Sequence, residues 1–485
     1  MDTLYTCRHL PGRLASVLIA ILCLPRLAAA QPADADRVDI LQDDDSLRRI
    51  VESAVARLDP ALGAVAHPDP FIAELAVLRG IELAKLESAV ARWRERAATP
   101  YSQGLAALFA GRFHEASVLI RRSLAASEAR RPEKLLALAS TDFAGGHYQA
   151  AQLALTSASS LRPDDPVVLL ALGSVLAVRG MTADAERVTR RALEIRLEAL
   201  GPEHPQVATA MIALARLLQM HSSLAEADSL HTRAATIRAR RLGTEHPQLA
   251  IALNGLAMVR AQQGRYAEAM PLNRRALAIA ETALGTGHPQ VALILGDRAG
   301  LLMQQGDYPA AERLYRLALS ISERTPGSLY LALALNNLAT ALNVQGRYRD
   351  AEPLYRHALL TLERGLGRRH PQVALALGNQ AGMLRRQGRF RDAERLYRRA
   401  LTVSEAALGP EHPQVALALN NLATILLMQG RHDVALPLYE RALAICQAAP
   451  DPAHPELRVV VVENLARTLR FVGRVDEANA LEQRE

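Results

Sequence analysis

One sequence unit recurs between Gly201 and the C-terminus, and this periodicity limits the fold more than any single motif. Its consensus is Leu-Gly-x-x-His-Pro-Gln-Val-Ala followed by Gln-Gly-Arg-Tyr-x-x-Ala. The His-Pro pair begins at His204, His246, His288, His370, His412 and His454, with spacings of 42, 42, 82, 42 and 42. A unit this short cannot bury a core alone and must stack on its neighbours, which predicts a solenoid.

A glycine in the middle of each unit gives an independent count. It recurs at Gly264, Gly306, Gly346, Gly388, Gly430 and Gly473. Upstream, Gly111, Gly146 and Gly180 mark slightly shorter units, and Ser222 holds the same place in the unit before Gly264. Together these ten positions predict ten helical pairs.

The unit from Leu242 to Ala283 shows why each half is helical. Gly243 follows good helix formers and suits a left-handed position that ends a helix. His246 then caps a new helix, with Pro247 in its first turn, where a missing N–H costs nothing. Apolar residues recur at helical spacing from 247 to 263 and from 266 to 283, so we expect helix A, a turn at Gly264, and helix B.

Small residues mark where helices must approach closely. Alanine recurs in the middle of helix A (Ala215, Ala257, Ala299, Ala339, Ala381, Ala423, Ala466) and five residues after the turn in helix B (Ala227, Ala269, Ala311, Ala351, Ala393, Ala435, Ala478). Tyr315, Tyr355, Tyr397 and Tyr439 line one face of helix B. We interpret both sets as core packing.

These motifs resemble a known family. Pro163, Leu172-Gly173, Ala185 and Ala192 match the tetratricopeptide repeat (TPR), and the longer units, as in 412–423, resemble its kinesin light chain type. The resemblance covers about residues 98–485. It implies an all-α, right-handed α-solenoid of about ten helix-turn-helix repeats, with repeats of canonical length over 98–198. Kinesin light chain-type repeats with a C-terminal cap follow over 199–485.

Residues 1–97 are expected to lie outside this array. Arg8 and Arg13 precede an apolar run from Leu14 to Leu24, and Ala28 to Ala30 resemble a cleavage site, so 1–30 is interpreted as a signal peptide. The run is shorter than the ~20 residues of a membrane-spanning helix. The mature protein is therefore predicted to be exported, periplasmic or secreted, without a stable membrane span; an uncleaved anchor is the alternative. Residues 31–97 are predicted to form an acidic lead-in and helices that cap the N-terminal end of the array.

The charge and the cysteine content argue against a nucleic-acid partner and against an internal disulfide. The formal net charge is +7, and nearly all of the basic residues are arginines, often in pairs. Solvated outer helix faces explain this pattern better than a nucleic-acid surface, so no nucleic-acid partner is expected. After signal cleavage Cys446 is the remaining cysteine, and one thiol cannot form an internal disulfide.

The motifs of common enzymes are missing from the sequence. It contains no phosphate-binding loop, no Cys-x-x-Cys and no His-Glu-x-x-His. The six His-Pro histidines are one repeat apart, ~10 Å by helix packing, whereas zinc ligands lie ~2 Å from one ion. We therefore predict a chain that is not an enzyme and binds neither metal nor cofactor.

Polar residues inside helix A are the candidate binding residues. They precede the mid-helix alanine although Asn is a poor helix former, and they are Asn254, Asn336, Asn337, Asn379, Asn420, Asn421 and Asn464. In the family, helix A lines the concave groove, and amides there contact an extended peptide backbone. Hydrogen bonding between adjacent helices is the other explanation. Arg385 and Arg386 stand where sister repeats carry Gln, Met or Val, and would favour acidic segments or a C-terminal carboxylate.

The function expected is a non-enzymatic scaffold that binds a peptide segment or partner protein in this groove. Two alternatives remain open. One is a regulatory or substrate-presenting subunit of an envelope enzyme, and the other is an RNA-binding helical-repeat protein. Fold alone does not choose among them, and the sequence leaves the partner, the pathway and the oligomeric state open.

Overall fold

The computed structural model describes residues 99–109, 112–128, 131–220, 223–324, 329–448 and 455–484. Within these ranges all regular structure is α-helical, and no helix is long and apolar enough to cross a membrane. The helices are α5 (Pro100–Phe109), α6 (Phe113–Ala126), α7 (Arg131–Ala144), α8 (Tyr148–Leu161), α9 (Pro166–Val178), α10 (Thr182–Leu200), α11 (Pro205–Met220), α12 (Leu224–Leu242), α13 (Pro247–Gln262), α14 (Tyr266–Leu284), α15 (Pro289–Gln304), α16 (Tyr308–Ser322), α17 (Leu329–Val344), α18 (Tyr348–Leu366), α19 (Pro371–Arg386), α20 (Phe390–Leu408), α21 (Pro413–Met428), α22 (His432–Ala448), α23 (Pro455–Phe471) and α24 (Val475–Arg484).

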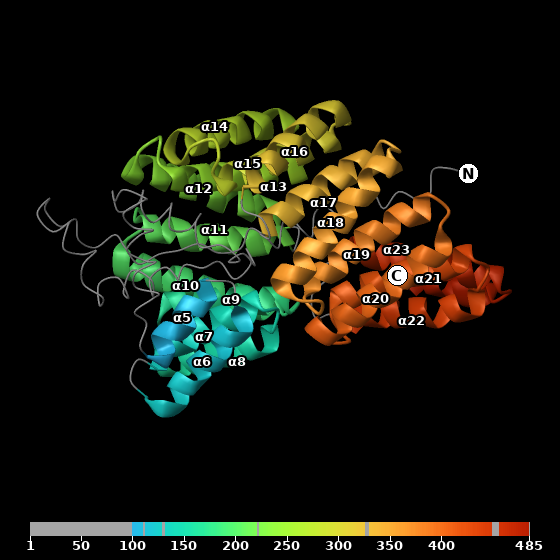
Figure 1. Ribbon diagram of the computed structural model, residues 1–485, viewed down its shortest axis with the longest axis horizontal. Helices are drawn as coiled ribbons and strands as arrows, with labels where there is room; N and C mark the ends of the chain where they lie inside the picture. The colour runs from blue at the N-terminus through green and yellow to red at the C-terminus, as the bar shows by residue number, and fades with distance from the viewer. Residues whose placement is uncertain are drawn as a thin grey trace, which may run out of the picture. The chain divides into compact units, whose positions relative to one another are not determined.

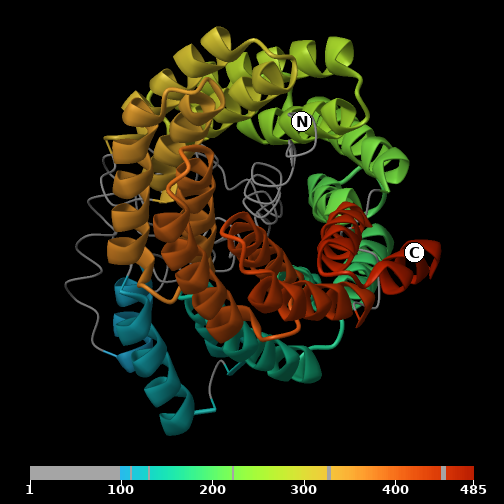
Figure 2. The same ribbon diagram turned by 90° about the vertical axis from the view of Figure 1, so that its right-hand side faces the viewer.

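Consecutive helices pair into hairpins, from α5 with α6 to α23 with α24, and Figure 1 shows them following one another in chain order. Helix B of one hairpin also packs on helix A of the next, as α12 does on α13 and α20 on α21. Helices A of neighbouring hairpins touch as well, for example α13 with α15 and α21 with α23 (Figure 2). Within the described ranges these paired helices confirm the predicted α-solenoid repeats.

The described helices form two compact units. Apart from Met220, which groups with the second unit, the first extends to Asn337 and the second begins at Leu338, so the division falls inside α17. The proposed change of repeat length near residue 199 does not coincide with this division, and it stays a prediction. The signal peptide over 1–30 and the helices expected within 31–97 lie outside the described residues.

The His-Pro motif starts helix A as expected. The Nδ1 atom of His246 accepts a hydrogen bond from the backbone N–H of Gln248 at 3.2 Å. Equivalent bonds of 3.1–3.2 Å form at His204, His288, His370 and His412. These histidines are therefore helix caps.

Gly243 differs from the prediction in one respect. Its φ of 97° is positive as expected, but its ψ of 161° places it in the extended region that only glycine occupies readily, not in the left-handed helical region. The chain therefore leaves α12 in an extended direction and reaches the His246 cap of α13. The glycine is required for a different reason from the one that the sequence suggested.

The alanine positions lie at close helix contacts, as predicted. The side chains of Ala269, Ala351 and Ala393 are fully buried, and so are those at the same position in all ten hairpins: Ala116, Ala151, Ala185, Ala227, Ala311, Ala435 and Ala478. The mid-helix alanines of helix A from Ala215 to Ala466 are equally buried. No larger side chain fits there without separating the helices.

The tyrosine face of helix B is buried and changes its chemistry along the chain. Tyr315, Tyr355, Tyr397 and Tyr439 are at most 7% exposed, which confirms them as core residues. In the preceding hairpins Asn273, His231 and Thr189 take the same position and are also buried. Three hairpins therefore place other polar side chains where the next four place a phenol ring.

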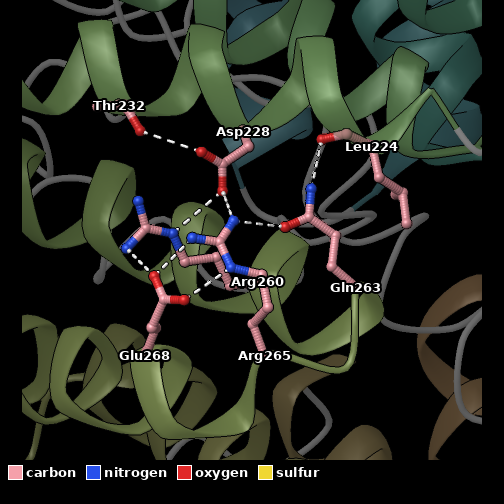
Figure 3. A network of polar contacts seen from close by, with 7 residues as sticks. All are labelled: Leu224, Asp228, Thr232, Arg260, Gln263, Arg265 and Glu268. Atoms are coloured by element: carbon pink, nitrogen blue, oxygen red, sulfur yellow. Dashed lines mark hydrogen bonds and ion pairs between the residues drawn. The ribbon is translucent and has the colours of Figure 1, made fainter.

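The arginine of the Gly-Arg-Tyr turn has a role that the sequence did not reveal. Figure 3 shows Arg265 and Arg260 approaching Asp228 of the preceding hairpin at 3.4 and 3.1 Å. Both arginines also contact Glu268, at 2.6 and 3.2 Å. The same position contacts the preceding helix B again where Arg389 meets Glu352 at 3.1 Å and Arg431 meets Glu394 at 3.0 Å. The turn therefore links successive repeats by charge.

Replacing Asp228 with Asn should weaken this link only slightly. The carboxylate is 19% exposed and its arginine partners are partly solvated, so we expect a loss of ~0.5–1 kcal/mol. The loss should shrink in high salt. Thermal unfolding at low and high ionic strength measures it, and a salt-independent loss would contradict an electrostatic origin.

Candidate partner-binding face

The predicted asparagines occupy two adjacent positions of helix A, three and two residues before the mid-helix alanine. We call these the amide positions. In the first unit they hold Asn254, Asn336 and Asn337, and in the second unit Asn379, Asn420, Asn421 and Asn464. Each group is described within its own unit.

In the first unit Asn254 bonds within its own hairpin and to the next one. Its Nδ2 atom donates to Oδ2 of Asp297 on α15 at 2.6 Å. Its Oδ1 atom accepts from Nδ2 of Asn273 at 2.8 Å, and the same Nδ2 lies 3.3 Å from the carbonyl oxygen of Ile294. The chain Asn273 to Asn254 to Asp297 thus joins three helices, which supports the hydrogen-bonding explanation for this asparagine.

The second unit contains a similar link. Nδ2 of Asn464 on α23 donates to Oδ1 of Asn420 on α21 at 3.0 Å. Asn420 is buried, and Asn464 also accepts from Arg467 at 2.6 Å. These two asparagines are therefore already engaged within the protein.

Two other asparagines differ from these. Asn337 and Asn421 are half-buried, and neither side chain forms a hydrogen bond within the described part of the chain. Asn336 and Asn379 are also half-buried, but both make further contacts. The amide groups of Asn337 and Asn421 are the ones that remain open to a partner.

Arg385 and Arg386 close α19 in the second unit. Arg385 is half-buried and Arg386 is exposed, and neither forms an ion pair or hydrogen bond with a described residue. Burial raises the pKa of Tyr355 to about 12, and the charge of Arg386 opposes that rise, which places Arg386 near this phenol. Most arginines at the turns are paired with acids, whereas these two guanidinium groups remain available to an anion.

Asp297 and His231 were missed by sequence reasoning. Asp297 fills an amide position, and burial raises the pKa of its carboxyl to about 6. His231 lies under Gly255, the glycine at another amide position, where an added Cβ would lie 2.4 Å from the ring. Burial first, then the charges of Arg216 and Arg238, lower the pKa of His231 to about 3. Comparing the repeats position by position would have exposed both exceptions.

The described residues contain no group of three or more His, Cys, Asp or Glu side chains that could hold a metal ion. The helix-capping histidines each bond to their own helix instead. What the arrangement offers chemically is a set of unpaired amides and guanidinium groups, which suits hydrogen bonding and ion pairing with a partner.

Two solved structures align with parts of the chain. Nearly identical TPR-like repeats of a protein from Podosopora anserina, assigned as a kinesin light chain, align with 22% identity and a TM-score of 0.34, over 40% of this chain and 92% of that one. BtubC (BKLC) from P. vanneervenii aligns with 24% identity and a TM-score of 0.38, over 47% of this chain and 91% of that one. No curated protein matches the chain.

The tetratricopeptide repeat model matches seven times, at residues 165–240, 223–282, 248–324, 290–364, 330–406, 372–448 and 414–484. These overlapping matches cover well over half of the sequence and follow the hairpins that the structure shows. The chain therefore belongs to the tetratricopeptide repeat family.

Proposed function

We propose that this protein is a non-enzymatic scaffold that holds an extended segment of a partner protein against helix A. The proposal depends on two half-buried amides that are unbonded within the described residues, Asn337 in the first unit and Asn421 in the second. An extended backbone presents donors and acceptors at regular intervals. An asparagine side chain can satisfy one of each.

Arg385 and Arg386 support a segment with acidic character at the second unit. Both side chains are reachable and lack an acidic partner among the described residues. A guanidinium group pairs with a carboxylate through two parallel hydrogen bonds, which gives direction as well as affinity. The partner is therefore proposed to carry Asp, Glu or a C-terminal carboxylate where it meets the end of α19.

We further propose that the scaffold works outside the cytoplasm. The support is the sequence over 1–30, with Arg8 and Arg13 before a short apolar run and three alanines before Gln31. N-terminal sequencing of the protein from its native host tests this directly. A mature chain that begins at Met1 or Asp2 would exclude cleavage near Gln31.

The binding face is tested with the double variant Asn337→Ala and Asn421→Ala. Immobilised wild-type protein first captures partners from envelope extract, and mass spectrometry identifies them. Each lost amide contact costs ~1 kcal/mol, so the double variant should retain the partner roughly ten- to thirtyfold less well. Thermal stability should change little, because neither amide is bonded within the part of the chain that the structure describes.

Asn479→Ala is the matched control, because Asn479 is an exposed asparagine on α24, a helix B. It should retain the partner as the wild type does. Arg385→Gln with Arg386→Gln should lose binding mainly at low ionic strength if the segment is acidic. A double asparagine variant that melts many degrees lower while holding the partner unchanged would show that these amides serve the fold.

A further inference from the structure

Helix α15 carries an open gap beside Asp297. Gly296 and Gly300 lie one helical turn apart, where α17 carries Asn336 and Thr340. A Cβ added at Gly296 would meet only Nδ2 of Asn337, at 4.0 Å, and one added at Gly300 would meet only the Tyr315 hydroxyl, at 3.7 Å. The two missing side chains therefore leave room for a group from outside.

The Tyr315 hydroxyl points toward this gap without a partner. Its side chain is only 7% exposed, and it forms no hydrogen bond within the described residues. In two sister hairpins the equivalent phenols bond to a threonine of helix A: Tyr355 with Thr340 at 3.0 Å, and Tyr439 with Thr424 at 2.9 Å. Gly300 takes the place of that threonine in α15, so the Tyr315 hydroxyl lacks the partner that its counterparts have.

Asp297 brings a negative charge to the same place. Its Oδ2 atom accepts from Asn254 at 2.6 Å, and no cation of the described chain lies within ion-pair distance of the carboxylate. The ionisable groups that face it are Arg216 from α11, which favours the charged form, and Tyr315 from α16. Burial dominates and raises the pKa to about 6, so at neutral pH the carboxylate is ionised but poorly compensated.

We propose that this gap binds the primary ammonium group of a lysine in the partner's extended segment. An ammonium has three donors, and the gap offers two acceptors, the Asp297 carboxylate and the Tyr315 hydroxyl. The atom of Asn337 nearest Gly296 is the donor Nδ2, so this amide supplies no third acceptor there. An anion would be repelled by Asp297, and an apolar group would leave both the carboxylate and the hydroxyl unsatisfied. This inference rests on the proposed function and adds a basic determinant in the first unit to the acidic one expected at the second.

The test uses the full chain labelled with ¹³C at aspartate carboxyl carbons, and the probe is the tripeptide acetyl-Gly-Lys-Gly-amide. Bound ammonium favours ionised Asp297, so saturating peptide should lower its pKa from about 6 by about one pH unit, equal to roughly tenfold tighter binding to the ionised form. The matched peptide acetyl-Gly-Gln-Gly-amide should leave the pKa unchanged. Peptide affinity should fall as the pH drops below 6, when Asp297 takes up a proton.

Gly300→Thr supplies the sharpest variant, because threonine is the residue that the sister helices use. Its hydroxyl should pair with Tyr315 and fill the gap, so the fold should persist while the lysine peptide binds at least fivefold more weakly. Gly382→Thr makes the same change in α19, beside Asn379 and not beside an aspartate, and should leave peptide binding as in the wild type. Asp297→Asn, which restores the common residue of the row, should abolish the preference for lysine over glutamine.

Three results would overturn the inference: no change in the Asp297 pKa with the lysine peptide, an equal change with the glutamine peptide, or full retention of binding in both Gly300→Thr and Asp297→Asn. None of them would bear on the scaffold itself. That proposal depends on partner capture by Asn337 and Asn421, which is measured separately. Conversely, a lysine peptide that binds while no partner is captured would support the ammonium site and leave the scaffold without support.

Discussion

Replacing Ala393 by tryptophan should unfold the hairpins around α20 while leaving the distant ones folded. The Ala393 side chain is fully buried where α20 packs on α19 and α21. Tryptophan cannot enter this contact without moving a helix, and overpacking of this kind costs ~1–3 kcal/mol or more. Because each repeat contacts mainly its neighbours, the damage should stay local.

Hydrogen exchange reports this helix by helix. Protection should fall in α19 to α21 and persist in α7 to α9 of the first unit. The control is Ala406→Trp on the same helix, because Ala406 is exposed and should accept the indole with little cost. Equal loss of protection from α7 to α23 would mean that the array unfolds as one cooperative unit and not as a chain of neighbours.

The repeat architecture follows from the sequence because it depends on local signals that recur. Expected helix bounds of 247–263 and 266–283 compare with Pro247–Gln262 and Tyr266–Leu284 in the structure. Pro247 and its histidine cap define the start, and Gly264, with a φ of 79°, defines the end. Each signal acts within one or two helical turns, so a single unit reveals it.

The candidate site was harder to predict from the sequence, because its chemistry depends on contacts between repeats. Asn254 and Asn421 look alike in sequence, yet Asn254 is bonded to Asp297 and Asn421 has no hydrogen bond within the described residues. The two lie at different amide positions: Asn254 is three residues before the alanine and Asn421 is two. The position three residues before the alanine reaches the next helix A, where Asn254 bonds to Asp297 and Asn420 to Asn464. The periodic pattern places the asparagines on helix A, and only the stacked structure shows which amides are already used.

The departures from the pattern are also where stability should depend on pH. His231 stands in the tyrosine position, and neither of its ring nitrogens has a hydrogen-bond partner among the described residues. Its pKa is about 3 in the folded chain against 6.5 for a free imidazole. Below pH 6.5 the His231 imidazole is therefore protonated in the unfolded chain but stays neutral in the folded chain. Stability falls as the pH drops from 6.5 toward 3. Between pH 7 and 5 the loss should be about 2 kcal/mol.

Asp297 acts in the opposite direction, because its pKa is raised to about 6 from 3.8. The folded chain protonates Asp297 at a higher pH than the unfolded chain does. Acidification from pH 7 to 5 should therefore raise the free energy of unfolding by about 1 kcal/mol. In the wild type the two trends largely cancel, and single variants should separate them. His231→Asn, which copies Asn273 of the next repeat, should remove the acid-induced loss, whereas Asp297→Asn should deepen it.

Thermal unfolding at pH 7 and 5, with hydrogen exchange of α12 to α15 to localise the effect, measures both changes. We compare the change in the free energy of unfolding between pH 7 and pH 5. For His231→Asn this change should be about 2 kcal/mol more favourable than for the wild type. Asp297→Asn should be about 1 kcal/mol less stable on the same scale. Parallel pH profiles for all three proteins would mean that water reaches both side chains, and the unpaired state of His231 would then no longer explain why its repeat departs from the tyrosine pattern.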